Sequence, residues 1–211
     1  MLVAAGKGER LGLGVPKALV EVAGKTLLEW ALLRFPEVDE VLVALPPGTK
    51  PPSGLRARFF EGGKTRQESV YRLLKEAKGD VVLVHDAARA YVVPEAVERV
   101  LAAARRTGAA APVVPVPDTL IEGENLYGRV LKRDQLRLVQ TPQGFSRELL
   151  LRAHEAALAE GRTATDDAQL VRALGHPVAL VPGDRRMFKV TYPEDLELLA
   201  ALLQSAADEL A

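Results

Sequence analysis

Short apolar runs alternate along the chain with segments in which apolar residues recur at helical spacing. A first run begins at Leu2, and three more, each typical of a parallel strand covered on both faces, are residues 40–45, 80–85 and 109–114. Helical patterns occupy residues 26–35, 65–77 and 94–106. Repeated strand–helix–strand units predict an α/β fold with a mainly parallel sheet and helices on both of its faces.

The stretch from residue 119 to residue 140 interrupts this alternation. Turn-forming residues separate short extended pieces here, and Leu136 and Leu138 indicate a strand with one covered face. We therefore predict a β-hairpin arm within residues 115–141 that projects from the sheet. Because an isolated hairpin is only marginally stable in water, the arm must pack against something, either its own domain or a second subunit.

After the arm the chain returns to the α/β pattern. Helical periodicity covers residues 147–160 and 166–174, residues 178–181 are expected to form a strand, and Pro193 opens a closing helix. The sequence contains no linker, internal repeat or low-complexity segment. Residues 1–211 are therefore expected to form one domain that carries the arm.

Composition narrows the range of partners. The 211 residues include 28 Lys and Arg against 28 Asp and Glu, so net charge gives no reason to expect binding to nucleic acid or to an anionic membrane. Cysteine is absent from the sequence, which excludes disulfides and thiolate catalysis. No apolar run approaches the ~18 residues of a membrane span and no secretory signal is visible, so we expect a soluble, cytoplasmic protein.

Candidate chemistry begins where the first predicted strand leads into a loop rich in glycine and cations. The loop carries Gly6, Gly8, Gly12 and Gly14 together with Lys7, Arg10 and Lys17. Glycines let backbone N–H groups approach an anion, and the cations favour a polyphosphate; the alternative is a mobile surface loop with solvated charges. The spacing matches neither the P-loop nor the G-x-G-x-x-G motif. Ala4 and Ala5 leave room for a flat base.

Further motifs follow this loop in a fixed order. They are residues 61–69, 84–89, 115–119, 140–143, 165–167 and 189–191. Together with residues 2–17 they span essentially the whole chain, and the ordered set resembles the 2-C-methyl-D-erythritol 4-phosphate cytidylyltransferase family of nucleotidyltransferases. The resemblance implies a Rossmann-like fold of the nucleotide-diphospho-sugar transferase type. It also implies Mg²⁺ as cofactor and a homodimer in which the arm crosses to the second subunit.

The activity implied by the resemblance is transfer of a cytidylyl group from CTP to 2-C-methyl-D-erythritol 4-phosphate. The products are 4-diphosphocytidyl-2-C-methyl-D-erythritol and pyrophosphate, on the methylerythritol phosphate route to isoprenoid precursors. A phosphate monoester has a second pKa of ~6, so the attacking group is largely a dianion at neutral pH and needs no general base. Positioning and fixed positive charge are then the main catalytic requirements.

The resemblance also assigns site residues in three groups. The expected catalytic cations are Arg10, Lys17 and Lys189, the last of which is expected to leave a strand. The expected CTP contacts are Ala4, Ala5, Gly6, Gly8, Gly63 and Ser69. The expected acceptor contacts are Asp86, Thr119, Arg133, Thr141 and Thr165. Asp86 is also a candidate metal ligand, and Thr119 and Arg133 would serve the neighbouring site if the arm is exchanged.

Purely structural roles are the alternatives for several of these residues. Gly63 can belong to a turn before a helix that Thr65 caps, and Asp86 can pair with Arg89. The preferred interpretation of Asp166 and Asp167 is the start of a helix. The histidines are His85, His154 and His176, and none of them is given a catalytic role.

Two other functions stay open at this point. A sister cytidylyltransferase acting on ribitol 5-phosphate shares most of the motifs, and the choice of acceptor depends on geometry. A nucleotide-binding protein without catalysis would keep the same fold. The intact cations Arg10, Lys17 and Lys189 argue against this last alternative.

Overall fold

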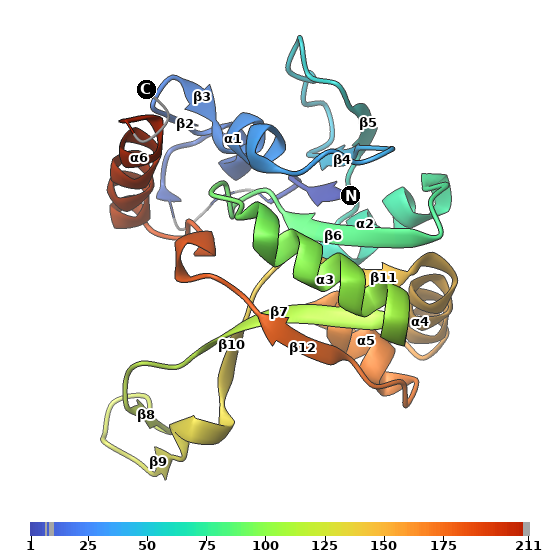
Figure 1. The fold of residues 1–211 in the computed structure, drawn as a ribbon, viewed down its shortest axis with the longest axis vertical. Coiled ribbons are helices and arrows are strands. Elements are labelled where there is room, and N and C mark those ends of the chain that lie inside the picture. The colour runs from blue at the N-terminus through green and yellow to red at the C-terminus, as the bar shows by residue number, and fades with distance from the viewer. Residues whose placement is uncertain (7, 9–10, 209–211) are drawn as a thin grey trace.

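The computed structural model describes residues 1–6, 8 and 11–208, and its centre is an eight-stranded sheet (Figure 1). The strands are β1 (Leu2–Val3), β4 (Leu42–Leu45), β5 (Arg58–Glu61), β6 (Val81–Asp86), β7 (Ala109–Pro115), β10 (Arg137–Val139), β11 (Gln143–Ser146) and β12 (Ala179–Pro182). Their order across the sheet is β10-β7-β11-β6-β1-β4-β5, and β12 pairs with β7 outside this path.

Most of the strands run in one direction. β1 pairs in parallel with β4 and β6, β4 with β5, and β12 with β7. β11 lies between β6 and β7 and is antiparallel to both, and β10 is antiparallel to β7. The predicted mainly parallel sheet is confirmed, but β7 has two antiparallel neighbours. The strand β11 was not predicted, because Phe145 is its one large apolar residue.

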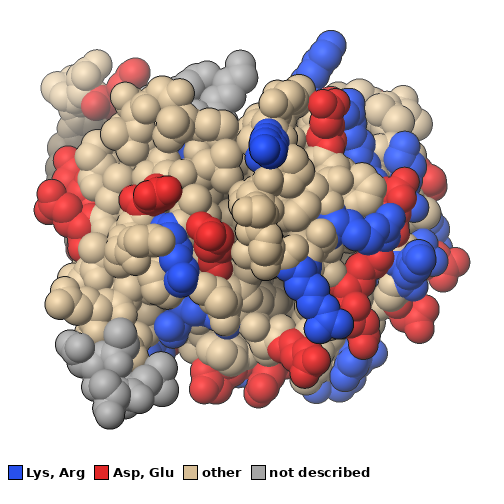
Figure 2. All heavy atoms as spheres, turned by 90° about the horizontal axis from the view of Figure 1, so that it is seen from above, with Lys and Arg blue, Asp and Glu red and all other residues tan. Residues whose placement is uncertain are grey.

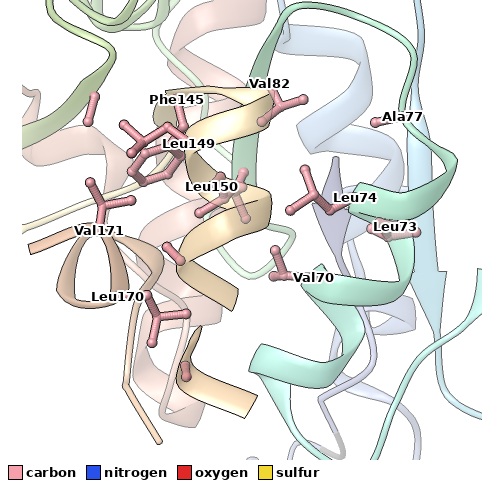
Figure 3. Close-up of a cluster of buried hydrophobic side chains, with 14 of the residues drawn as sticks. Val70, Leu73, Leu74, Ala77, Val82, Phe145, Leu149, Leu150, Leu170 and Val171 are labelled. Carbon is pink, nitrogen blue, oxygen red and sulfur yellow. The ribbon is translucent and has the colours of Figure 1, made fainter. Parts of the chain in front are cut away.

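Helices cover both faces of the sheet, as the sequence predicts. On one face, α1 (Leu27–Arg34) and α3 (Pro94–Thr107) pack on strand residues that include Leu2 and Val43. On the other face, α2 (Arg66–Glu76), α4 (Arg147–Ala159) and α5 (Asp167–Ala173) surround Val82 and Phe145 (Figure 3). The closing helix α6 (Pro193–Asp208) packs beside α1 through Leu199 and Leu203.

The largest buried cluster holds together the face that carries α2, α4 and α5. Phe145, Leu73, Leu74 and Leu150 are fully buried there and interdigitate between the helices and the sheet (Figure 3). Burying one such side chain stabilises the fold by about 1.5–3 kcal/mol. This cluster therefore fixes the first turns of α2 and α5, which both reach the site described below.

Capping residues set where those two helices begin. The Thr65 hydroxyl accepts from the Glu68 N–H (3.0 Å), which confirms the predicted cap of α2. The Asp166 carboxylate accepts from the Gln169 N–H (3.0 Å) and caps α5. Each such cap satisfies an N–H group that the first helical turn leaves unpaired.

The predicted arm projects from the sheet (Figure 1). β7 and β10 form its base, and its tip contains β8 (Leu120–Ile121), which is antiparallel to β9 (Val130–Leu131), and the 3-10 turn η3 (Arg133–Gln135). The expected covered face of β10 is not formed by any of the described residues, since Leu138 is 49 % exposed. At the tip, Leu126 is 85 % exposed and Tyr127 is 74 % exposed.

Charged side chains of both signs are interspersed over the face shown in Figure 2, in keeping with the equal numbers of acidic and basic residues. No helix within the described residues is both long enough and apolar enough to cross a membrane. A small hairpin, β2 (Glu21–Val22) and β3 (Lys25–Thr26), and the 3-10 turns η2 (Lys17–Leu19) and η4 (Arg185–Met187) complete the described elements.

Candidate active site at the carboxyl edge of the sheet

Four parallel strands, β5, β4, β1 and β6, end at the same edge of the sheet. Val3 lies opposite both Ala44 and Asp86. Leu45 lies opposite Glu61. The segments that leave β1, β5 and β6 are therefore neighbours, in the place where open parallel sheets bind their ligands.

Two segments of small residues lie against each other at this edge. A Cβ added to Gly62 would lie 2.5 Å from the Cβ of Ala5, so only glycine allows this approach. The Gly63 N–H donates to the Ser69 hydroxyl (2.9 Å), which donates to the carbonyl of Thr65 (2.9 Å). The structure thus brings Ala5, Gly63 and Ser69 together, and the buried Ser69 hydroxyl holds the glycine turn against the start of α2.

The glycine loop folds back on itself next to these segments. Ala4 is buried at the end of β1, and the Lys17 N–H donates to the carbonyl of Gly6 (3.2 Å). Gly8 has a φ of +71°, and a Cβ there would lie 3.0 Å from the Cβ of Lys17. Gly6, Gly8 and Lys17 are therefore close together, whereas the predicted catalytic residue Arg10 lies outside the described residues.

A cluster of ion pairs surrounds Asp86 at the end of β6. Its carboxylate accepts from Arg66 Nε (2.9 Å) and from Lys189 Nζ (2.7 Å). Arg66 Nη1 also donates to Asp167 (2.7 Å). The alternative of an Asp86–Arg89 ion pair is wrong, because Arg89 instead donates to the carbonyls of two other residues, Met187 and Val139.

Charge balance within this cluster sets its protonation. Burial by itself would raise the pKa of Asp86, but the charges of Arg66 and Lys189 and the hydrogen bonds they donate hold that pKa well below its usual range. Burial likewise acts against the charge of Arg66, and the carboxylates of Asp167 and Asp86 outweigh it and raise its pKa. Two basic side chains, Arg66 and Lys189, therefore face the two carboxylates of Asp86 and Asp167.

A hydrogen-bond chain links Asp86 to the interior. The Asp86 N–H donates to the Thr141 hydroxyl (3.0 Å), which lies 3.1 Å from His85 Nδ1. His85 Nε2 lies 3.1 Å from the carbonyl of Arg89. A carbonyl can only accept, so Nε2 carries the proton and Nδ1 accepts from Thr141. Burial lowers the pKa of His85 to about 4, so it is neutral and structural here.

Lys189 does not leave a strand, contrary to the prediction. β12 ends at Pro182, and the chain then forms the turn η4, capped by Asp184, whose carboxylate accepts from the Arg186 N–H (2.8 Å). Lys189 follows this turn. Asp184 caps η4, so the backbone before Lys189 forms this turn and not the expected strand. Hydrogen bonds from Gln140 and Arg89, which are distant in the sequence, fix the position of the turn.

Asp167 and His154 are site residues whose full role the sequence did not indicate. Asp167 begins α5 as predicted, but its buried carboxylate also bridges Arg66 and His154 Nε2 (2.9 Å). His154 stacks on Tyr71 with ring centroids 6.0 Å apart. Arg66 stands at the start of the predicted helix 65–77 and within the motif 61–69, so the sequence alone could have indicated that it belongs to the site. Nothing in the sequence pairs His154 with Asp167.

An open cavity of ≈ 320 Å³ lies over the charged cluster. Its walls include four residues expected in the site, Asp86, Thr141, Thr165 and Lys189. The other lining residues are Arg66, Arg89, Val139, Gln140, Gln143, Asp166 and Gln169. Within the described residues, Arg66 Nη2 and Arg89 Nε are buried without a hydrogen-bond partner. Such donors favour a ligand rich in oxygen atoms.

The two expected acceptor contacts on the arm do not line this cavity. Thr119 and Arg133 are exposed, and Arg133 Nη1 donates to the carbonyl of Pro117 within the arm. One chain alone therefore does not bring them to Asp86. No group of three or more His, Asp or Glu side chains placed to hold a metal ion occurs among the described residues.

A doubly wound, mainly parallel sheet with a glycine-rich loop and a charged cavity at its carboxyl edge defines an α/β protein of the class that binds its ligands at this edge. A model of the family "IspD: 2-C-methyl-D-erythritol 4-phosphate cytidylyltransferase" matches residues 1–205. The chain belongs to this family.

Similar proteins of known sequence and structure carry the same description. The 2-C-methyl-D-erythritol 4-phosphate cytidylyltransferase of Thermus thermophilus is 59% identical over 204 residues, which cover 96% of this chain and 95% of that one. The Deinococcus radiodurans enzyme of the same name is 53% identical over 96% of this chain and 88% of its own length. A crystal structure of the enzyme from Thermus thermophilus has a TM-score of 0.89 at 55% identity, covering 96% of this chain and 97% of that one.

Proposed function

We propose that the protein transfers the cytidylyl group of CTP to the phosphate of 2-C-methyl-D-erythritol 4-phosphate and releases pyrophosphate. The observation that carries the proposal is the charged cavity at the carboxyl edge, where Lys189 and Arg66 pair with Asp86. Asp86 lies opposite Val3, at the end of the strand that leads into the glycine loop. Family membership supplies the identity of both substrates. The product is 4-diphosphocytidyl-2-C-methyl-D-erythritol.

In this reaction an oxygen of the acceptor phosphate attacks the α-phosphorus of CTP. One P–O bond forms at the α-phosphorus, and the bond between the α-phosphorus and the oxygen that joins it to the β-phosphorus breaks, so that this oxygen leaves with pyrophosphate. The acceptor is largely a dianion above its second pKa of ~6, so no residue has to remove a proton. Repulsion between anions is the main barrier, and fixed cations reduce it most in the transition state.

The nucleotide is expected to lie along the ends of β1 and β5. Backbone groups of Ala4, Ala5 and Gly63 would contact cytosine, because small residues let the base approach. Ser69 holds that turn and would act through it. Gly6 and Gly8 would present N–H groups to the triphosphate.

Arg10, Lys17 and Lys189 are proposed as the catalytic cations. Lys17 follows the glycine loop, and Lys189 stands at the rim of the cavity, with 40 % of its side chain exposed. In the substrate complex Lys189 would exchange its contact with Asp86 for phosphate oxygens of the substrates. The released carboxylate is then available to an acceptor hydroxyl or to a metal ion.

The acceptor is expected in the cavity, near Asp86, Thr141 and Thr165. Its phosphate would be held by Thr119 and Arg133 from the arm of a second subunit, since these residues do not reach the cavity of their own chain. A guanidinium suits this task because it can grip two phosphate oxygens at once.

The arm is also the proposed homodimer contact. β10 is exposed along its length, and the apolar side chains of Leu126, Tyr127 and Leu138 face solvent in the isolated chain. A second copy of the arm or of the sheet edge would cover this surface.

Mg²⁺ is the proposed cofactor. It would neutralise charge on the triphosphate oxygens, and these oxygens and water would supply most of its ligands. Asp86 is the candidate protein ligand.

The proposed compartment is the cytoplasm. Both substrates are highly charged and do not cross membranes freely, so the enzyme is expected in the compartment that holds them.

The proposal is tested by measuring pyrophosphate release from CTP with a panel of polyol phosphates. We expect release with 2-C-methyl-D-erythritol 4-phosphate and none with CTP alone. Faster turnover of ribitol 5-phosphate would show that this compound, and not 2-C-methyl-D-erythritol 4-phosphate, is the preferred acceptor. CTP binding without release on any acceptor would reduce the protein to a nucleotide-binding function.

A further inference from the structure

The backbone around Lys189 is fixed by contacts that the proposed chemistry does not use. Met187 and Val190, on either side of Lys189, are both fully buried. The Val190 N–H donates to the carbonyl of Ala88 (2.9 Å). The Met187 carbonyl accepts from Arg89 Nη1 (2.8 Å). The side chain of Lys189 is long and flexible, so its charge can be placed reliably only if this backbone is held still.

The side-chain amide of Gln140 forms hydrogen bonds to the same turn. Its Nε2 donates to the carbonyl of Asp184 (2.8 Å) and to that of Met187 (3.3 Å), and its Oε1 accepts from the Asp184 N–H (3.1 Å). Gln140 is only 4 % exposed, so water cannot replace these bonds easily. Both ends of η4 are therefore tied to one side chain.

Gly183 shows how closely the amide fits. A Cβ added at Gly183 would lie 2.2 Å from Gln140 Oε1, whereas the next nearest atoms are 3.3 Å away. A larger residue at this position would thus displace the amide before it disturbed anything else. The absence of a side chain at Gly183 is what allows Gln140 to reach the turn.

Gln140 is itself held at the base of the arm. Its N–H donates to the carbonyl of Pro112 in β7 (2.8 Å), and it directly follows β10. Arg89 Nη2 donates to the carbonyl of Val139, the last residue of β10 (3.3 Å). The residue after Gln140 is Thr141, whose hydroxyl accepts from the Asp86 N–H. Residues at the base of the arm therefore support both members of the Lys189–Asp86 pair: Gln140 bonds to the turn before Lys189, and Thr141 bonds to the backbone of Asp86.

We propose that Gln140 is a positioning residue for Lys189: its amide fixes the turn 183–188 and thereby places the Lys189 ammonium at the reacting phosphates. The inference rests on the proposed catalytic role of Lys189. Gln140 acts through the backbone of this turn, since all the hydrogen bonds of its amide within the described chain go to residues of η4 or its cap.

The test compares kcat of the wild type with that of Gln140→Met, which keeps the size of the side chain and removes its hydrogen bonds. We expect kcat to fall roughly ten- to hundredfold, the scale for a catalytic group misplaced by about 1 Å, with little change in KM for CTP. Gly183→Ala should give the same loss with Gln140 intact. Arg99→Met is the matched control, because it removes an exposed bond to the carbonyl of Pro182 in the same connection.

The decisive comparison repeats Gln140→Met in a Lys189→Met background. If Gln140 acts by placing Lys189, the second substitution has no further effect on kcat there. An equal fold-loss in both backgrounds, or full activity of Gln140→Met with the wild-type Lys189, would overturn the inference. Full activity of Lys189→Met alone would instead overturn the catalytic role of Lys189, so the two failures are distinguishable.

Discussion

The buried carboxylate of Asp86 needs ion-pair partners, and the sequence shows this need more clearly than it shows the partners. A carboxylate at the end of an apolar strand is unfavourable unless it is paired, and the sequence predicts a partner for that reason. The pairing with Arg66 and Lys189 could not be predicted, because these residues are 20 and 103 positions away in the chain. Arg89, the near neighbour, was the wrong choice because its guanidinium turns toward the backbone of Met187.

His85 gives a prediction about acid stability. Its folded-state pKa of about 4 is below the ordinary value, so its contribution is complete above ~6.5 and is lost as the pH falls toward 4. In metal-free buffer, we expect the contribution of His85 to the free energy of unfolding in urea to fall by about 2 kcal/mol between pH ~7 and pH ~5.

The matched variants for this prediction are His85→Gln and His176→Gln. The first should make the fall in the free energy of unfolding between these pH values smaller by about 2 kcal/mol. The second should retain it, because His176 lies in a loop and its ring Nδ1 lies beside the carbonyl of the adjacent Pro177. A wild-type stability that does not change between these pH values would contradict the assigned neutral state of His85.

At the scale of elements, the ends of helices were predictable and some strands were not. Thr65 and Asp166 cap α2 and α5 through local hydrogen bonds, which the sequence encodes within three residues. β11 consists of Gln143–Ser146 and contains one glycine and one large apolar residue, so only its two neighbours make it a strand. The arm was predicted from its turns, but no segment within the described part of the chain covers Leu126 and Tyr127 at its tip.

Exchange of the arm predicts complementation between subunits. Arg133→Ala and Lys189→Met should each reduce activity, since the first removes a proposed acceptor contact and the second a proposed catalytic cation. In a co-expressed mixture, half of the dimers carry one copy of each variant and one intact site, so roughly a quarter of wild-type activity should return.

The control pairs Lys17→Ala with Lys189→Met. Both residues are assigned to the same site of the same chain, so this mixture should recover nothing. If the Arg133→Ala and Lys189→Met mixture is no more active than its parents, Arg133 serves its own chain and the exchange of arms is wrong.

At the scale of the molecule, the sheet explains why so much of the site was predictable. Parallel strands bring their carboxyl ends to one edge, so the loop after β1 and the end of β6 were expected at that edge once these two strands were recognised. The strand β5, which leads to Gly63 at the same edge, was not predicted from the sequence. Lys189 and Asp167 reach the same edge through η4 and α5, whose positions depend on packing over the whole chain. The motif order indicated these later residues, but not their contacts.

The central claim is that fixed cations at this edge carry the catalysis, and Lys17→Ala tests it most directly. With CTP and 2-C-methyl-D-erythritol 4-phosphate both saturating, kcat of the folded variant should fall roughly a hundredfold or more, the scale for a lost transition-state donor. Lys25→Ala, at an exposed lysine 5.9 Å from the ring of Trp30, should keep full activity. Full activity of a folded Lys17→Ala enzyme would contradict the account.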